Sequence, residues 1–369
     1  MSISRKILSV FLAFFLIFGS VTVIASASDE INDAERCSIS ICSSFENFIT
    51  KVKNFFADFI EKIKNLFNFD ADSCDLRKYS EASFEIPGLD EDFVPQGVCY
   101  VESLDAFAVS GYVKNEVSRI YLVYDDGITK KIYLDSFDLH AGGIASNGTD
   151  LWVSAGGNEM KGGHIYHMST DALRDADDGD TVAFDGRFGV YSRASALYCS
   201  DDTLWVAEFY EKKDYPVNES HYYGKNHAWA SGYKLPLNVD YTAEESPVPD
   251  VVLSVPDKVQ GMCITDSGDV VFSTSYGRKN NSYIYVFDDY LNWDKSSVNI
   301  NSADVDMYIT TKNHRIIKSK MPTLMEGADY YKGKMYVIFE SGAKTYSNAK
   351  EIIKTAWQTD IDRAVKNVK

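Results

Sequence analysis

Two glutamates stand at the ends of neighbouring strands in a predicted β-hairpin over residues 325–346. Aromatic and β-branched residues predict the two strands, and Gly333 supplies the tight turn between them. Glu326 opens the first strand and Glu340 ends the second, so both carboxyl groups should lie at the same end of the hairpin. Two such carboxyl groups, with a histidine or arginine nearby, can supply the acid and the base for hydrolysis.

His140 and Arg193 are the residues that could assist this pair, because each precedes a similar strand elsewhere in the chain. We therefore expect Glu326, Glu340, His140 and Arg193 as candidate catalytic residues. The alternative is structural, since buried polar side chains can equally form hydrogen bonds to one another and to the backbone of neighbouring strands. The residue types alone do not name a reaction.

The hairpin is the last of five similar units. Each unit opens with a polar residue, a small residue and a short apolar strand, and a second strand follows after a polar turn. The five openings lie at residues 96–100, 142–145, 195–198, 260–264 and 326–330. A third strand follows in every unit, and fourth strands are expected at residues 130–134, 181–184, 251–255 and 315–319.

The fifth unit has no fourth strand in its own sequence, and residues 83–87 supply the missing one. Pro87 precedes the first opening much as Pro256 precedes the opening at 260–264. Pairing this N-terminal strand with the C-terminal unit closes a ring and leaves no open sheet edge at the joint. The sequence thus predicts an all-β fold, a five-bladed β-propeller closed by an N-terminal strand, over residues 80–369.

Over roughly residues 83–369 the chain resembles secreted bacterial β-propellers of the NHL, YVTN and SMP-30-like repeat families. The resemblance rests on the glycine-apolar openings, the Leu-Trp-Val-Ser segment at 151–154 and the Ile-Tyr pairs. The resemblance implies a channel lined by the first strands, with ligand sites where those strands begin. Five-bladed members include glycoside hydrolases, metal-binding lactonases and a calcium-dependent nucleotidase, so calcium is the cofactor that the resemblance suggests. The hydrolases set acidic residues on several first strands, whereas here only Glu326 is acidic.

Polar residues and long loops at this same face give a candidate ligand-binding set. The loop at 209–226 carries several tyrosines, which offer flat ring faces to sugars or peptides, and the loop at 341–354 should overhang the same mouth. The candidates are Gln96, Glu208, Tyr210, Tyr222, Tyr223 and Gln260. The alternative is that the tyrosines pack against neighbouring blades.

We therefore expect a non-catalytic protein that binds an extracellular glycan or peptide through its looped face. A secreted hydrolase of a glycoside, lactone or phosphate ester, using the carboxylates at the channel mouth, is the alternative. The net charge of -17 disfavours nucleic acid as a partner. No metal-ligand set is predicted, because the cysteines lack zinc-site spacing and the acidic run at 175–180 departs from a calcium loop.

The N-terminal part reads as a targeting segment followed by a helix. Two basic residues, an apolar run at 7–24 and Ala-Ser-Ala at 25–27 predict a signal peptide over residues 1–27 and a secreted, extracellular protein. An uncleaved membrane anchor is the competing interpretation. Residues 28–79 are expected to form an amphipathic helix and a linker, with the helix docked on the next domain or, alternatively, bound to a membrane surface or partner.

Six cysteines divide into two groups. Export permits disulfides, and a pair among Cys37, Cys42 and Cys74 is the candidate. Cys99, Cys199 and Cys263 fall within predicted inner strands, where buried thiols are expected.

Overall fold

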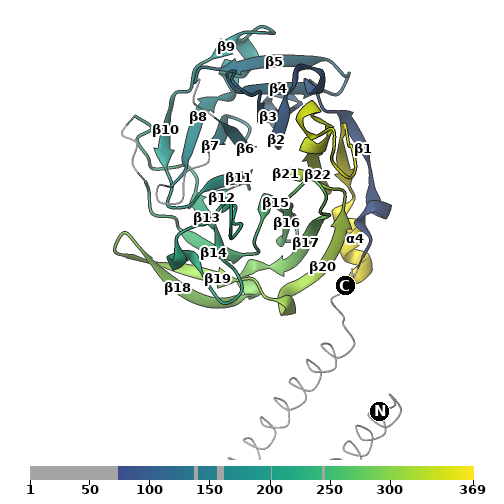
Figure 1. The fold of residues 1–369 in the computed structure, drawn as a ribbon. Helices are drawn as coiled ribbons and strands as arrows, with labels where there is room; N and C mark the ends of the chain where they lie inside the picture. Colours follow the sequence, from purple (N-terminus) through teal and green to yellow (C-terminus); the bar gives the residue numbers. More distant parts are fainter. Residues whose placement is uncertain (1–73, 137–139, 156–161, 201, 243–245) are drawn as a thin grey trace, which may run out of the picture. The chain divides into compact units, whose positions relative to one another are not determined.

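A computed structural model describes residues 74–136, 140–155, 162–200, 202–242 and 246–369. The predicted signal segment and amphipathic helix lie outside the described residues. The domain is nearly all β, with five sheets set around one axis, and the innermost strand of each sheet contacts that of the next until the ring closes (Figure 1). The predicted five-bladed β-propeller is thus confirmed. Within the described residues, no helix has the length and apolar character needed to span a membrane.

Each blade is built on four antiparallel strands, with the first strand of the unit innermost. Blade one contains β2 (Val94–Val101), β3 (Ala106–Tyr112), β4 (Arg119–Tyr124) and β5 (Thr129–Leu134). Blade two contains β6 (Ala141–Ser146), β7 (Asp150–Ala155), β8 (His164–Ser169) and β10 (Gly186–Gly189). Blade three is built on β11 (Ala194–Cys199), β12 (Thr203–Glu208), β13 (Ala228–Lys234) and β14 (Val251–Val255). Blade four contains β15 (Val259–Ile264), β16 (Asp269–Thr274), β17 (Ser282–Asp289) and β20 (Arg315–Met321).

Blade five joins the two ends of the domain. It contains β21 (Met325–Tyr331), β22 (Lys334–Phe339), β23 (Thr355–Thr359) and, as its outermost strand, β1 (Ser80–Glu85). β1 pairs antiparallel with β23, and the hydroxyl groups of Ser80 and Thr359 lie 2.8 Å apart across this pair. The predicted closure by an N-terminal strand is therefore confirmed.

The expected fourth strand of the second unit, at residues 181–184, is wrong. Its short strand β9 (Thr181–Val182) instead pairs in parallel with β5 of blade one. The helix α3 (Thr170–Asp175) and the turn after it carry the chain to the neighbouring blade, where the backbone N–H of Tyr133 donates to the carbonyl of Asp180 over 2.8 Å. β10 takes the outer position in blade two and pairs with β8.

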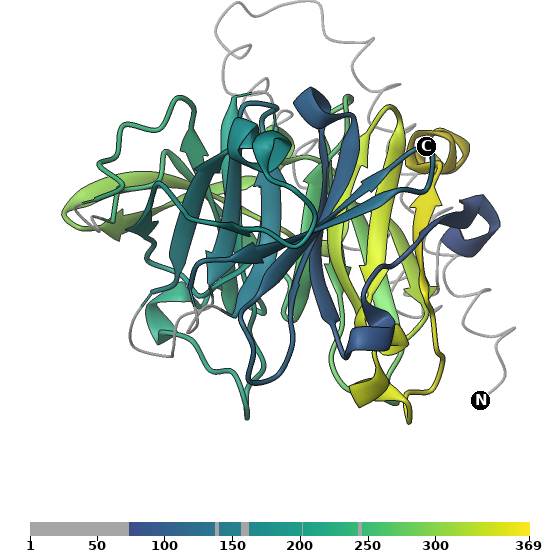
Figure 2. The same ribbon diagram turned by 90° about the horizontal axis from the view of Figure 1, so that it is seen from above.

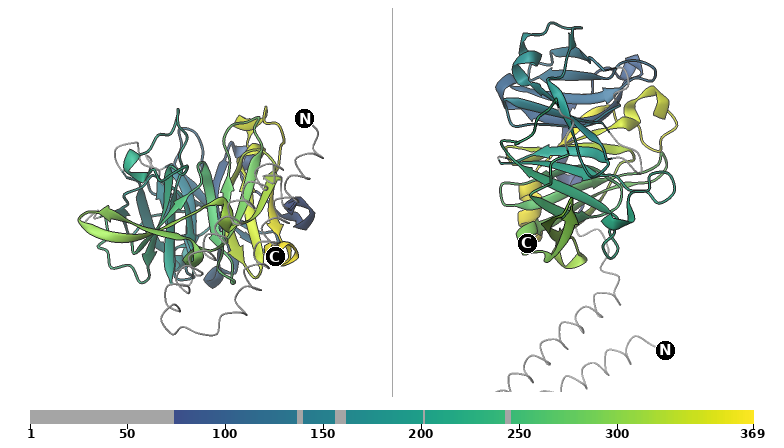
Figure 3. Two further views of the ribbon diagram at one scale, coloured as in Figure 1. Left: turned by 90° about the horizontal axis from the view of Figure 1, so that it is seen from below. Right: turned by 90° about the vertical axis from the view of Figure 1, so that its left-hand side faces the viewer.

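A hairpin that the sequence pattern did not predict lies on the rim. β18 (Asp294–Ile300) and β19 (Ala303–Ile309) arise between the third and fourth strands of blade four. β19 pairs in parallel with β14, which extends blade three to six strands, and the hairpin projects beyond the blades in the left-hand view of Figure 3. Its buried side chains include Val305 and Met307, which pack with Trp229 of blade three.

The blades meet closely along the channel because small residues follow the polar openings. A Cβ atom added to Gly143 would lie 2.4 Å from the backbone nitrogen of Leu197 in the next blade, too close for any side chain. Serines on the second strands add bonds between blades, as where Ser110 Oγ donates to the carbonyl of Gly142 over 2.6 Å. Seen edge-on, the strands run between two faces and the connecting turns emerge at both (Figure 2).

The cysteines in the described part of the chain form no disulfide. Cys74, one of the three residues expected to supply a pair, is a free thiol, while Cys37 and Cys42 lie outside the described residues. Cys99 and Cys263 are buried free thiols within inner strands, as predicted. The C-terminal helix α4 (Ile361–Val368) packs against the propeller and buries Ile361 and Ala364.

Candidate functional site

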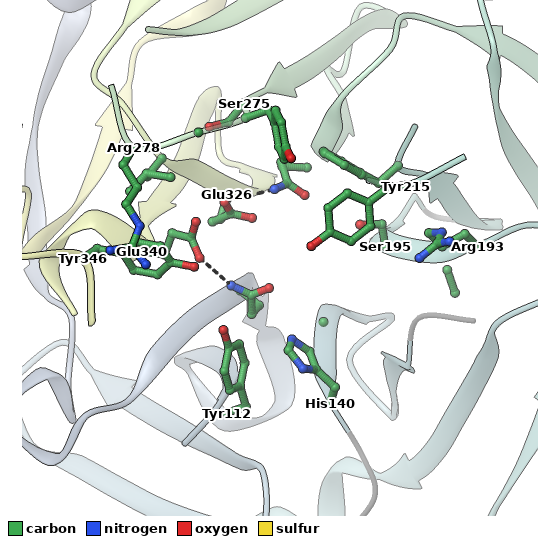
Figure 4. Close-up of a pocket in the computed structure, with 18 residues that line it drawn as sticks. Tyr112, His140, Arg193, Ser195, Tyr215, Ser275, Arg278, Glu326, Glu340 and Tyr346 are labelled. Atoms are coloured by element: carbon green, nitrogen blue, oxygen red, sulfur yellow. Dashed lines mark hydrogen bonds between the residues drawn. The ribbon is translucent and has the colours of Figure 1, made fainter. Parts of the chain in front are cut away.

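The inner strands and the loops above them enclose a cavity of about 650 Å³. Polar side chains from all five blades meet there, together with several aromatic rings (Figure 4). A cavity of this size lies within the range of pockets that take small molecules. Its lining is the best candidate for a functional site.

A repeated backbone feature places these polar side chains. In every blade the pairing of the first two strands is interrupted close to the start of the inner strand. Four residues at these interruptions, Gln96, Ser195, Gln260 and Glu326, present polar side chains to the cavity, and in blade two Gly142 lines it instead. A β-bulge redirects a side chain from the regular alternation of a strand. The polar-then-small opening in the sequence is therefore the signature of a bulge that faces the cavity.

Glu326 and Glu340 face the same part of the cavity, although both are buried (Figure 4). Their exposed fractions are 2% and 7%. Each carboxyl also accepts a bond from a glutamine, because Gln260 Nε2 donates to Glu326 Oε1 over 3.1 Å and Gln96 Nε2 donates to Glu340 Oε2 over 3.2 Å (Figure 4). The sequence prediction that the two glutamates lie at one end of a hairpin agrees with this placement.

Burial and mutual repulsion govern the protonation of this pair. Burial is the larger cause that raises the pKa of Glu326 well above its usual value, and the neighbouring charge of Glu340 adds to it. Burial also raises the pKa of Glu340 to about 7, although bonds from Tyr346 and Gln96 act in the opposite direction. Two carboxyl groups in such contact cannot both ionise easily. The pair therefore retains at least one proton at neutral pH.

The other titratable side chains beside the pair are neutral near pH 7. Burial, followed by the charge of Glu340, raises the pKa of both Tyr112 and Tyr346, so both phenols stay protonated. Burial lowers the pKa of His140, which favours the uncharged imidazole. The rings of Tyr112 and His140 lie with their centroids 3.9 Å apart. These groups can donate or accept hydrogen bonds without adding charge.

Two arginines supply the positive charge of the lining. The Arg278 guanidinium lies 4.7 Å from the centre of the Tyr346 ring, and its Nη1 donates to the Thr345 carbonyl and to Asn348 Oδ1, each over 2.9 Å. Arg193 lies at another part of the cavity wall, with its guanidinium 5.5 Å from the centre of the Tyr215 ring (Figure 4). Both side chains are thus held by loops that border the cavity.

Six of the ten residues singled out from the sequence line the cavity: Glu326, Glu340, His140, Arg193, Gln96 and Gln260. The other four, Glu208, Tyr210, Tyr222 and Tyr223, are not among its lining residues. Tyr210 is buried and its ring stacks on His227 with centroids 4.8 Å apart, whereas Tyr222 and Tyr223 are exposed. The loop at 209–226 reaches the cavity through Phe209 and Tyr215 instead.

Glu208 has a structural position beneath that loop. It is buried, and its Oε2 lies 2.8 Å from His221 Nδ1 while its Oε1 accepts the backbone N–H of Arg193 over 3.0 Å. His221 in turn stacks on Trp229 with ring centroids 3.8 Å apart. This cluster fixes the loop that carries Tyr215 and the strand opening that carries Arg193.

Several lining residues were not singled out from the sequence, among them Tyr112, Tyr276, Arg278 and Tyr346. Tyr346 falls in the loop at 341–354, which was expected to overhang the mouth. Tyr276 and Arg278 belong to the connection between the second and third strands of blade four, which is too short to attract notice by its length. These residues could have been found from their position, because the connections between second and third strands all emerge at the face that carries the cavity.

No group of three or more histidine, cysteine, aspartate or glutamate side chains among residues 74–369, with the gaps noted above, is arranged to hold a metal ion. Among the described lining residues, Glu326 and Glu340 are the ones that carry carboxyl groups. The placement of the described residues therefore supplies no complete ligand set for the calcium ion that the resemblance suggested.

No protein-family model and no curated protein sequence matches this chain. Among solved structures, it is similar to the PQQ-bound aldose sugar dehydrogenase of Streptomyces coelicolor, with 12% identity, 70% of this chain and 76% of that chain covered, and a TM-score of 0.41. The glutaminyl cyclase of Myxococcus xanthus is similar at 10% identity, with 70% and 91% covered and a TM-score of 0.38. A gluconolactonase of Xanthomonas campestris is similar at 12% identity, with 72% of this chain and 85% of that chain covered and a TM-score of 0.34. Likenesses this weak carry no argument about activity, and the strand pairing itself establishes the five blades.

Proposed function

We propose that this protein binds a small polyhydroxylated ligand, of the size of one or two sugar units, in the cavity at the centre of the propeller. The observation that carries the proposal is the paired Glu326 and Glu340, each held by a glutamine amide and facing a cavity of about 650 Å³. Carboxyl and amide groups in fixed positions suit ligands with several hydroxyl groups.

The aromatic part of the lining supports the same class of ligand. Tyr112, Phe209, Tyr215, Tyr276 and Tyr346 border the cavity, and flat rings beside polar groups suit a ligand that is apolar on one face and hydroxylated at its edge. A peptide, the other ligand expected from the sequence, is less favoured because the described site is a compact cavity rather than an extended groove. We also propose that the ligand is met outside the cell, and the signal segment predicted over residues 1–27 supports this location.

The test is a calorimetric titration of the purified full chain with mono- and disaccharides and with tripeptides. We expect binding of a saccharide and a loss of affinity of about tenfold or more in the Glu326→Gln/Glu340→Gln double variant. The matched control is Glu81→Gln/Glu85→Gln, which changes two exposed glutamates on the rim strand β1. Binding of tripeptides alone, or equal effects of the two double variants, would contradict the proposal.

Hydrolysis is the second candidate, because two carboxyl groups with raised pKa values line the same cavity. In such a pair one carboxylate can activate water while the other donates a proton to the substrate. Turnover of a sugar lactone or a nitrophenyl ester that disappears in the glutamine double variant would favour this candidate. Saccharide binding without such turnover favours the first.

A further inference from the structure

The charges around the cavity indicate which ligand it selects. We infer that the ligand carries one negative charge, that Arg278 binds this charge beside Glu340, and that binding is accompanied by uptake of a proton at the glutamate pair. This inference rests on the proposed binding function and specifies the chemical class of the ligand, a sugar acid or a similar hydroxylated anion.

The first step is the charge of the lining at neutral pH. Arg193 and Arg278 contribute two positive charges, while the pair Glu326 and Glu340 retains at least one proton and thus carries no more than one negative charge. The groups facing the pair add none, because Tyr112 and Tyr346 stay protonated and His140 is neutral. The lining that the described residues form is therefore positive at pH 7 and below, although the whole chain is acidic.

The second step is the geometry of Arg278. Of its nitrogens only Nη1 has hydrogen-bond partners within the described part of the chain, the Thr345 carbonyl and Asn348 Oδ1. These bonds and the Tyr346 ring orient the guanidinium, and its remaining N–H groups stay available to a carboxylate, which guanidinium groups bind through two parallel bonds. Figure 4 shows the Arg278 side chain running toward Tyr346 and Glu340.

Arg193 adds a second donor at another part of the wall. Its Nε is buried and has no hydrogen-bond partner among the described residues, and its Nη2 has only a long contact of 3.5 Å with the Pro216 carbonyl. An unpaired buried donor is costly, so a ligand oxygen that reaches it would be stabilising. Asp214, which accepts a bond from the Tyr276 hydroxyl nearby, is not among the lining residues.

The third step is the coupling to protons. A negative charge placed beside Glu340 makes ionisation of that carboxyl harder, so the bound state holds more protons than the free state. Affinity for an anion should then be greatest below pH 7 and should fall as the pH rises through about 7, where Glu340 ionises. A cation held by both carboxylates, calcium included, would show the opposite dependence.

The experiment compares three hexoses of similar shape and different charge, D-glucuronate, D-glucose and D-glucosamine, by calorimetry of the full chain at pH 6 and pH 8.5. We expect glucuronate to bind about tenfold more tightly than glucose at pH 6, and glucosamine to bind most weakly. The preference for glucuronate should fall to within about twofold at pH 8.5. Titrations at pH 7.5 in buffers of different ionisation enthalpy should show proton uptake, because a large part of Glu340 is ionised in the free protein at that pH.

Three variants locate the effect. Arg278→Met should reduce the ratio of glucuronate to glucose affinity to about one, and this ratio is insensitive to a general loss of loop order. Arg363→Met is the matched control, because Arg363 also lies over a tyrosine ring, Tyr79, but on helix α4 away from the cavity. Glu340→Gln should remove most of the dependence on pH while glucuronate remains preferred.

Other results of these titrations would overturn either the inference about charge or the proposed function itself. Glucose binding as tightly as glucuronate at pH 6 overturns the inference and leaves the proposed function standing. Glucuronate affinity that rises with pH, or calcium binding that strengthens between pH 6 and 8.5 and is lost in Glu340→Gln, also overturns it. Absence of binding by all three hexoses and by the saccharide panel overturns the proposed function itself.

Discussion

At the scale of single residues, the protonation of Glu340 is the property from which the behaviour of the cavity follows. The carboxyl stands just after β22, is 7% exposed, and lies beside Glu326, so burial raises its pKa to about 7. Nothing in the local sequence predicts this shift, because burial by the folded domain causes it, and Gln96 and Arg278, which oppose it, come from distant parts of the chain. Position in a hairpin could be predicted, whereas the electrostatic environment could not.

The raised pKa has a consequence for stability. Between the usual value of 4.5 and about 7 the folded protein holds a proton on Glu340 that the unfolded chain has lost, so this group's contribution to stability is lost as the pH rises through that window. Glu340→Gln removes the titration. We expect the free energy of unfolding of this variant, relative to wild type, to rise by roughly 3 kcal/mol between pH 4.5 and pH 8.

Denaturant unfolding at these two pH values measures the difference. Glu351→Gln, an exposed glutamate in the loop after β22, is the control and should follow the wild-type dependence on pH. If Glu340→Gln and Glu351→Gln give the same difference, Glu340 is ionised in the folded protein at ordinary pH and the charge count of the cavity is wrong.

At the scale of elements, the openings of the inner strands both close the ring and shape the site. The same short segment places a polar side chain in the cavity and then a small residue against the next blade, as in Gln260 followed by Gly261. This double role explains why the openings could be recognised from the sequence. The small position is held by glycine in four blades, at Gly97, Gly143, Gly261 and Gly327. In blade three it is held by Ala196.

Because blade three has alanine where the other blades have glycine, the two residue types can be exchanged in a matched pair of substitutions. A Cβ atom on Gly143 would lie 2.4 Å from the Leu197 nitrogen, so Gly143→Ala must push two inner strands apart and should cost about 1–3 kcal/mol of stability. Ala196→Gly, at the equivalent position of blade three, removes one methyl group and should cost less, about 1 kcal/mol. Thermal and denaturant unfolding measure the stability of the two variants relative to wild type. A Gly143→Ala protein as stable as wild type would show that the blades are free to separate there.

At the scale of the whole molecule, most of the architecture could be predicted, because five strand–turn–strand units recur with recognisable spacing. The closing strand could be predicted too, since blade five lacked a fourth strand of its own. The rim could not: β9 joins blade one and β18–β19 joins blade three through pairings that no local pattern records. Among site residues, those at strand openings were found, and those on short connections, such as Arg278, were missed.

The joint between β1 and β23 can be tested directly. Ser80 and Thr359 are partners across it, with their hydroxyl oxygens 2.8 Å apart, so cysteines at both positions are placed to form a disulfide. The bond would link residues 279 positions apart, and long loops give the largest entropic effect. We expect the oxidised Ser80→Cys/Thr359→Cys protein to unfold roughly 5–10 °C above its reduced form.

The reduced double variant and the two single variants are the controls, and each should unfold close to wild type. An oxidised form that melts no higher than the reduced form would mean that separation of β1 from β23 does not limit unfolding, and that the ring opens elsewhere first.

Three pairings cross from one repeat to another: β1 with β23, β9 with β5, and β19 with β14. β9 and β19 come from the repeats that follow the sheets they extend, whereas β1 precedes all five repeats and completes the last sheet. Deletion of the second or the fourth repeat would therefore also remove the added outer strands of blade one or blade three. We therefore expect loss of a single blade to disturb its neighbour as well, whereas substitutions in the cavity and its loops leave these pairings intact.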